Sequence, residues 1–182
     1  GRENTVEAKE IAPWGKLLKS SQFWSLGLQF MITDYIMYVF LAWLPLYLME
    51  VHGFSLSKMG LWAAAPWLSL MAVVSCCGYL SDKAIAAGFS QNLVKTSTGA
   101  VGILLCACTL FIATRTADPM MNVFWLSVAL GSLGLTMSAS WSSVISMGGR
   151  FAGSVSGWMN FWGNIGGVLA PSVTAWVATT YG

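Results

Sequence analysis

Residues 151–180 read FAGSVSGWMNFWGNIGGVLAPSVTAWVATT and contain no charged side chain. An α-helix needs only about 20 predominantly apolar residues to cross the hydrocarbon core of a bilayer. Lipid offers no hydrogen-bond partners, so a spanning segment must satisfy its backbone groups internally, as a helix does. The stretch therefore predicts a membrane-spanning helix.

The composition of the whole chain agrees with this stretch. Charged residues make up 9% of the 182 residues and hydrophobic residues 56%, whereas a soluble domain carries about 25% charged residues. A water-soluble protein of this size leaves roughly 30% of its surface exposed and could not hide so much apolar area. The net charge of +2 is too small to indicate a polyanionic partner. These values exclude a soluble enzyme, a nucleic-acid-binding protein and a disordered segment, and they place the chain in a lipid bilayer.

Five apolar spans follow a polar N-terminal stretch, and they predict an all-α membrane protein. We expect transmembrane helices over residues 21–49, 58–80, 94–114, 120–146 and 151–180. Residues 1–20 are interpreted as a cytoplasmic linker that ends in a short interfacial segment. The chain begins without an initiator Met or a signal peptide and ends directly after an apolar run, so we expect a fragment that lacks a sixth helix.

Lysine and arginine side chains predict the orientation, because cytoplasmic loops are enriched in them. The side that holds the N-terminus carries Arg2, Lys9, Lys16, Lys19, Lys83, Lys95 and Arg150. The opposite side carries Lys58 and Arg115. We therefore predict a cytoplasmic N-terminus, with no Lys or Arg in the interior of a span.

Small and polar side chains mark one stripe of the fifth span. Gly149, Gly153 and Gly157 recur every four residues, a spacing that lets two helix backbones approach closely. Asn160 and Asn164 continue this stripe, and carboxamides inside a membrane need a partner, water or a ligand. The two amides either bind a substrate or hydrogen-bond to a neighbouring helix, and Asn160 is the better candidate for a ligand.

The fourth span carries hydroxyl groups beside an indole ring. Ser138, Ser140 and Trp141 lie in the segment LTMSASW, residues 135–141, and Ser140 lies off the helix face that Ser138 and Trp141 share. Hydroxyls next to an aromatic ring can bind a polyol through hydrogen bonds and ring packing. Serines in helices also bond back to their own helix carbonyls. The sequence leaves both interpretations open.

The first span combines a polar face with an acidic residue. Gln29 shares that face with Gln22, Ser25 and Thr33, whereas Asp34 lies on the opposite side. A carboxylate at the bilayer centre costs about 2.5–3.5 kcal/mol on insertion scales. Asp34 either carries a proton or is a structural acid bonded to a neighbouring helix, and its distance from the Gln29 face favours the structural role.

The segment GYLSDK, residues 78–83, lies where the second span leaves the membrane on the predicted cytoplasmic side. Gly78 would allow close crossing of helices, and Asp82 could accept hydrogen bonds from a neighbouring helix. Arg150, at the start of the fifth span, is a candidate partner for Asp82, with Lys83 beside it. A solvated turn is the alternative.

The cysteines and the single histidine give no sign of a metal site or an enzyme. The cysteines lie in apolar runs without CxxC spacing or a His partner, so we expect small buried hydrophobes, no metal, no disulfide and no cofactor. They are Cys76, Cys77, Cys106 and Cys108. His52 lies in an outer loop, and the spans contain no Ser/His or paired-acid arrangement.

Several of these segments resemble a known family. GYLSDK at a helix exit resembles the loop signature of the major facilitator superfamily. The segments that resemble its anion:cation symporter family, which includes hexuronate, glucarate and galactonate permeases, are FLAWLPLYL (40–48), LWAAAPWLSLMAVVSCCGYLSDK (61–83) and RFAGSVSGWMNFWGNIGGVLAPSVTAW (150–176). The resemblance covers almost the whole chain, with residues 21–182 as helices 7–11 of a twelve-helix transporter.

The resemblance implies a carrier that moves a small organic anion, such as a sugar acid, usually with a proton and by alternating access. It implies a bacterial inner membrane as the location, and an N-terminal half and a final helix beyond this chain. The carboxylate-binding Arg and the proton-coupling acids would lie in that first half. The implied substrate contacts of this chain are Gln29, Ser138, Ser140, Trp141 and Asn160.

We expect the two halves of such a carrier to rock about the substrate, with Asp82 and Arg150 as a cytoplasmic latch. Three alternatives remain open at this point. The cargo could be phosphate, a dicarboxylate or a nicotinate-like aromatic acid. The chain could be part of a non-transporting scaffold subunit. An intramembrane enzyme is disfavoured for the reasons given above.

Overall fold

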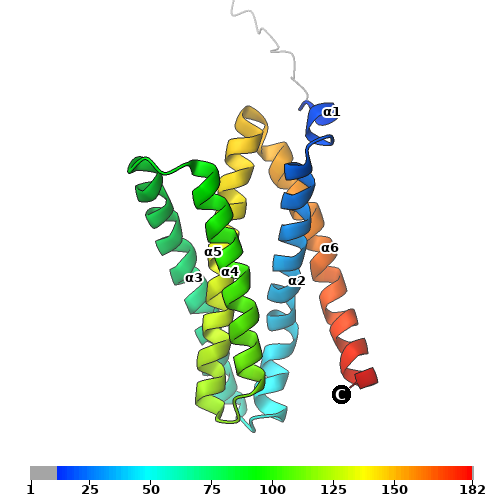
Figure 1. Ribbon diagram of the computed structural model, residues 1–182. Coiled ribbons are helices and arrows are strands. Elements are labelled where there is room, and N and C mark those ends of the chain that lie inside the picture. The colour runs from blue at the N-terminus through cyan, green and yellow to red at the C-terminus, as the bar shows by residue number, and fades with distance from the viewer. Residues whose placement is uncertain (1–11, 182) are drawn as a thin grey trace, which may run out of the picture.

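The computed structural model describes residues 12–181, and this part of the chain is helical without a strand. The predicted all-α class is therefore confirmed. A short helix precedes five long ones, as Figure 1 shows. The elements are α1 (Trp14–Leu17), α2 (Ser21–Glu50), α3 (Leu56–Ala86), α4 (Gln91–Thr114), α5 (Pro119–Gly148), the 3-10 turn η1 (Gly149–Phe151) and α6 (Ala152–Tyr181).

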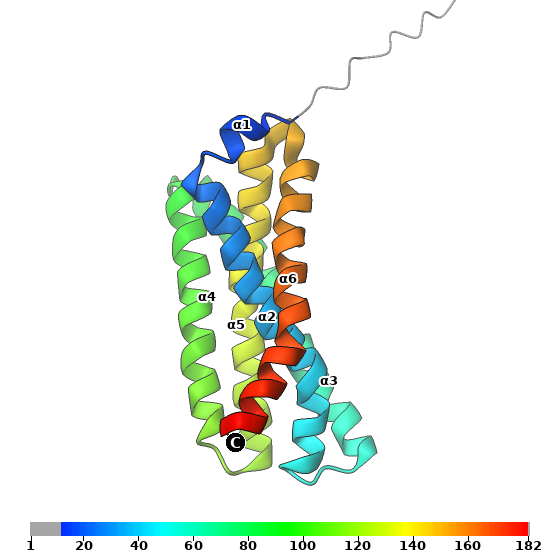
Figure 2. The same ribbon diagram turned by 90° about the vertical axis from the view of Figure 1, so that its right-hand side faces the viewer.

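The first four predicted spans each lie within one long helix, which extends the predicted range by a few residues, and the fifth, 151–180, begins at the last residue of η1 and continues through α6. Four helical segments are long and apolar enough to cross a membrane, and the fourth, Pro119–Tyr181, comprises α5, η1 and α6. Gly149 takes a φ of +49°, a conformation that glycine adopts without strain. There the chain reverses, so α6 returns antiparallel to α5 (Figures 1 and 2). Of the predicted linker 1–20, residues 1–11 lie outside the described residues.

The connections gather at two ends of the helix bundle. The first end, called the α1 end below, holds α1, the α3–α4 connection and the α5–α6 turn (Figures 1 and 2). The α2–α3 and α4–α5 connections lie at the opposite end, toward which α6 runs. This alternation agrees with the predicted order of crossings.

The most extensive helix contacts are those of α4 with α5, α2 with α6 and α3 with α5. Glycines make these contacts close. A Cβ atom at Gly166 of α6 would overlap the carbonyl oxygen of Met31, and one at Gly163 would overlap the Asp34 carboxylate in the same helix, α2. A Cβ at Gly134 of α5 would lie 3.1 Å from the carbonyl oxygen of Leu70 in α3. Backbones that approach this closely stabilise membrane helix pairs through dispersion.

The glycines predicted to pack are different ones. A Cβ at Gly149, Gly153, Gly157 or Gly78 would meet no atom within 4 Å. Gly153 and Gly157 are exposed, whereas Val155 and Met159, from the same turns of α6, are buried in a cluster with side chains of α2. The predicted packing role of these glycines is therefore not seen against the described helices.

Aromatic rings fill the space between α2 and α6 near the α1 end. Phe23 stacks on Trp158 with ring centroids 4.8 Å apart, and Trp24 meets Trp158 edge-on at 5.0 Å. Trp162 lies 5.6 Å from Trp158 and 5.9 Å from Trp24. This tryptophan cluster, Trp24, Trp158 and Trp162, extends the contact between the two helices.

At the opposite end, one buried amide joins three helices. The Asn122 Nδ2 group of α5 donates to the Tyr47 hydroxyl of α2 at 3.0 Å and to the Ala113 carbonyl of α4 at 2.9 Å. Asp118 caps α5 by accepting from the Met121 N–H at 2.8 Å. These bonds satisfy polar groups that lipid could not satisfy.

Candidate functional site

A polar cleft of about 510 Å³ lies between α2, α4 and α5 at the α1 end. Its volume is in the range of ligand-binding pockets, about 300–1,000 Å³. Its polar lining contains amides, hydroxyls and one ammonium group, and no Asp or Glu. The polar residues of the lining are Ser21, Gln22, Ser25, Gln29, Gln91, Asn92, Lys95, Thr96, Ser143 and Ser146. We call this the polar cleft.

The polar cleft continues toward the middle of the helices. A second cavity of about 380 Å³ shares Ser25, Gln29 and Lys95 with it and reaches Gly99 and Ala139. The deeper part is less polar, because small apolar side chains replace the amides. A ligand in this space would meet hydrogen-bonding groups at one end and a narrower apolar wall at the other.

Gln29 lines both cavities and contacts Ser140, which is buried and lines neither. The Gln29 Nε2 group of α2 donates to the Ser140 Oγ of α5 at 3.3 Å. Ser140 Oγ donates in turn to the Thr136 carbonyl at 2.9 Å, and the Thr33 hydroxyl donates to the Gln29 carbonyl at 3.0 Å. The position of Ser140 off the Ser138 face is what turns it toward Gln29.

Lys95 is the residue that the sequence reasoning missed. It was counted among the basic side chains of the predicted cytoplasmic side, but it lies in the second turn of α4 and is 8% exposed. Its Nζ donates to the Ser142 carbonyl at 3.0 Å and to the Ser146 Oγ at 2.7 Å, both in α5. Lys95 thus lies near the beginning of its span, with its side chain buried rather than exposed. The signal was available, because Lys95 is the second residue of the predicted span 94–114.

The other predicted substrate contacts do not line the polar cleft. Asn160 Nδ2 donates to the Ser156 carbonyl at 3.1 Å, and Asn164 Nδ2 donates to the Asn160 carbonyl at 2.8 Å, so both amides bond within α6. Asn160 is half-buried and Asn164 is exposed. Ser138 is half-buried in α5.

Trp141 connects α5 with the α2–α6 contact. Its side chain is 40% exposed, and its ring meets Phe30 edge-on with centroids 6.1 Å apart. Phe30 also lies against Gly163, three residues after Asn160. Of the predicted contacts, Gln29 thus lines the polar cleft and bonds to the buried Ser140, and Trp141 packs against Phe30.

Asp34 lies in the α2–α6 contact, half-buried against Gly163. One residue further, the Tyr35 hydroxyl and the Thr174 hydroxyl of α6 lie 3.2 Å apart. Asp34 faces α6 rather than the polar cleft, which agrees with its predicted position away from Gln29. Its role as a structural acid or a proton carrier stays a prediction.

The residues of the predicted latch lie at the α1 end. Asp82 is exposed in the last turns of α3, and the Lys83 ammonium lies 4.6 Å from the centre of the Tyr79 ring. The Arg150 guanidinium lies 5.1 Å from the centre of the Phe151 ring in η1. The contact between Asp82 and Arg150 stays a prediction.

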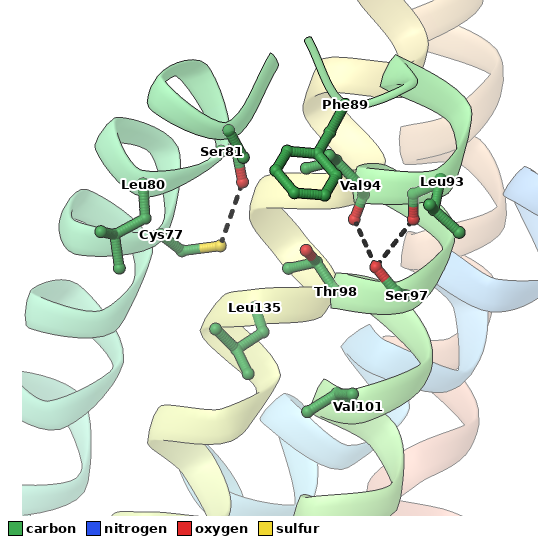
Figure 3. A pocket seen from close by; sticks show the side chains of 11 residues that line it. Cys77, Leu80, Ser81, Phe89, Leu93, Val94, Ser97, Thr98, Val101 and Leu135 are labelled. Atoms are coloured by element: carbon green, nitrogen blue, oxygen red, sulfur yellow. Dashed lines mark hydrogen bonds between the residues drawn. The ribbon is translucent and has the colours of Figure 1, made fainter. Parts of the chain in front are cut away.

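A larger cavity, about 610 Å³, lies between α3 and α4 and is mostly apolar (Figure 3). Leu80, Phe89 and Val101 line it. Its Ser97 hydroxyl donates to the Leu93 carbonyl of its own helix at 2.7 Å, as the dashed line in Figure 3 marks. A cavity with a mostly apolar lining suits lipid chains better than an anion.

Metal ligands do not gather in residues 12–181, where no group of three His, Cys, Asp or Glu side chains could hold an ion. The four cysteines are free, with Cys77 and Cys106 buried and Cys76 and Cys108 exposed. The polar cleft therefore offers hydrogen bonds and one positive charge as its means of binding.

Comparison with known proteins assigns the chain a family. The sequence model described as Major Facilitator Superfamily matches residues 1–171. A D-galactonate transporter of Escherichia coli is 31% identical over 80% of this chain and 34% of its own length. A protein named probable sulfoacetate transporter, from Cupriavidus necator, is 31% identical over 91% of this chain and 38% of its own length.

A plant protein is similar as well. The protein named probable anion transporter 1, chloroplastic, from Oryza sativa, is 27% identical over 93% of this chain and 32% of its own length. The chain thus spans about a third of the length of the curated relatives it matches.

Proposed function

The chain belongs to the major facilitator superfamily, and from this premise we propose that it works as part of a secondary active carrier for a small organic anion. The substrate class we propose is the sugar acids, hexonates or hexuronates, moved together with a proton. The galactonate transporter among the relatives supports this class. The sulfoacetate and anion transporters among them support an anionic cargo more generally.

One observation carries the proposal, which is the polar cleft that Gln29 lines together with other amides and hydroxyls. The Gln29 amide of α2 lines the cleft and donates to the buried Ser140 hydroxyl of α5 at 3.3 Å, so Gln29 is held in place where a ligand hydroxyl could bond to it. Neutral donors and acceptors of this kind recognise the hydroxyl groups of a sugar acid. Such groups are expensive in a membrane and mark substrate paths.

The mechanism that fits this family is alternating access between two halves of the carrier. We propose that Ser138, Trp141, Asn160 and Asn164 contact the substrate when the halves close around it. Asp82 and Arg150 would hold the two sides of the α1 end together in one state.

Proton coupling and location complete the proposal. The α1 end carries most of the basic side chains of the described residues, which supports a cytoplasmic position for it. They are Lys16, Lys19, Lys83, Lys95 and Arg150. A bacterial inner membrane would supply the proton gradient that drives uptake.

Binding and transport by the full-length carrier test this function. Hexonates, hexuronates, phosphate and dicarboxylates are titrated by calorimetry, and uptake into proteoliposomes is followed with and without an inward proton gradient. We expect sugar acids to bind, and the gradient to accelerate their uptake. Binding of phosphate or dicarboxylates alone would favour the other cargo, and no transport of any anion would favour a scaffold.

Two variants connect the function to the residues. Gln29→Ala and Asn160→Ala should each raise the Kd for the best sugar acid by about 2- to 10-fold, the loss of one hydrogen bond. Ser97→Ala is the matched control, because its hydroxyl bonds within α4 at the apolar cavity. Unchanged affinity in both Gln29→Ala and Asn160→Ala would overturn the assigned contacts.

A further inference from the structure

The Lys95 ammonium is a buried positive charge with neutral partners. Its side chain is 8% exposed, and its two hydrogen bonds go to the Ser142 carbonyl and the Ser146 hydroxyl. The lining of the polar cleft contains no Asp or Glu. A buried charge without a counter-charge is costly, so an anion in the cleft would stabilise it.

The geometry leaves room for this anion. An ammonium group has three N–H donors, and the two bonds to α5 use two of them. Lys95 belongs to the first turns of α4, a segment without an acidic side chain in its first turn. The helix N-terminus adds a partial positive charge there, which also favours an anion.

The surroundings of Lys95 indicate which kind of anion fits. Gln22, Ser25, Asn92 and Thr96 line the same cleft and carry neutral donors and acceptors. One cation among many neutral hydrogen-bonding groups matches a ligand with one carboxylate and several hydroxyls. A phosphate or a dicarboxylate would leave its second charge without a partner among these side chains.

We propose that Lys95 binds the carboxylate of the transported hydroxy acid when the carrier is open at the α1 end, with the neutral side chains of the polar cleft holding its hydroxyls. This inference rests on the proposed function. It adds to that function a cation within this chain, in the same cleft as Gln29, whereas the family resemblance implied that the counter-charge lies in another part of the carrier.

The test uses the full-length carrier in nanodiscs of phosphatidylcholine, with D-galactonate as the probe and the uncharged polyol galactitol as its analogue. Lys95→Met should raise the Kd for D-galactonate by about tenfold or more, because a charge-assisted bond is lost. Lys95→Arg should restore most of the affinity, and the binding of galactitol should change little. Lys16→Met, at the same end and exposed, is the matched control and should bind as the wild type does.

A second variant keeps the test decisive if Lys95→Met does not fold. In a cysteine-free background, Ser25→Cys is labelled with a membrane-impermeant thiol reagent applied from the α1 side. We expect labelling, and we expect D-galactonate but not galactitol to slow it. A Ser25→Cys thiol that is never labelled, or that D-galactonate does not protect, would overturn the proposal.

The remaining outcomes separate the proposal from its premise. A wild-type carrier that binds no sugar acid contradicts the proposed function itself. A wild type that binds D-galactonate no better than a folded Lys95→Met variant contradicts only the role of Lys95. If Lys95→Met leaves the binding of D-galactonate unchanged and alters only how far phosphatidylglycerol vesicles stabilise the carrier, the cleft holds a lipid phosphate. The proposal is then wrong.

Discussion

Helix α2 meets its neighbours in two opposite ways. Against α6 it is in close contact, with glycines of α6 lying directly on the Met31 backbone and the Asp34 side chain. Toward α4 it leaves the polar cleft, where amides and hydroxyls stand around Lys95. Helices in lipid gain no hydrophobic energy by associating, so close glycine contacts supply their stability. Polar side chains inside a membrane cost free energy, so their presence in the polar cleft indicates a function.

The largest effect on stability is expected from disrupting the close contact between α2 and α6. In Gly166→Ala the added methyl group would overlap the Met31 carbonyl oxygen, and two backbones would have to separate. We expect a loss of about 1–3 kcal/mol in the free energy of unfolding, as for other overpacked sites. Thermal unfolding of the full-length carrier measures it. Gly60→Ala, where a Cβ meets no atom within 4 Å, is the control, and equal stability of both variants would show that α2 and α6 are not packed in this way.

An intermediate effect is expected from a single hydrogen bond between helices. The buried Thr136 hydroxyl of α5 donates to the Gly99 carbonyl of α4 at 3.1 Å. Thr136→Val keeps the shape and removes the bond, so it should destabilise by about 0.6 kcal/mol, the average for such bonds in a membrane protein. Thr109→Val is the control, because Thr109 bonds to the Leu105 carbonyl of its own helix at 2.7 Å. A larger loss for Thr109→Val would contradict this ranking.

The smallest effect on stability is expected in the polar cleft. Ser25 is exposed there, so Ser25→Ala should change the free energy of unfolding by less than about 0.5 kcal/mol. The same change should raise the Kd for a sugar acid about 2- to 10-fold, the loss of one hydrogen bond. Calorimetry and thermal unfolding of one preparation give both values. Ser75→Ala in α3, whose hydroxyl bonds to the Met71 carbonyl, should change neither, and a stability loss at Ser25 would remove the distinction between the two regions.

The sequence was sufficient to predict where the helices lie in the chain, but not which face of each helix packs against its neighbours. Apolar runs predict each long helix because spanning length and backbone satisfaction depend on the local sequence alone. The four-residue spacing of Gly153 and Gly157 is also local, but which face meets α2 depends on how the helices pack. The close backbone contacts fall at Gly163 and Gly166 instead, and the earlier turns of α6 meet α2 through larger side chains such as Val155 and Trp158.

The candidate site shows the same limit. The stripes of polar residues select Gln29 and place Ser140 off the Ser138 face, and the structure brings Gln29 and Ser140 together from two helices. Lys95 was missed because a lysine at the edge of an apolar run is usually in water. Its ammonium reaches Ser142 and Ser146 only because α4 packs along α5.

The tryptophan cluster between α2 and α6 has an optical consequence. Trp24 and Trp158 lie edge-on with ring centres 5.0 Å apart, and Trp162 lies within 6 Å of both. Aromatic rings in fixed packing give circular dichroism in the near ultraviolet, and this signal is lost when the packing loosens. Trp24 and Trp162 also border a small pocket with Ser25, at the margin of the polar cleft. The contact that holds α2 to α6 thus carries its own spectroscopic signature, beside the side chains expected to meet a ligand.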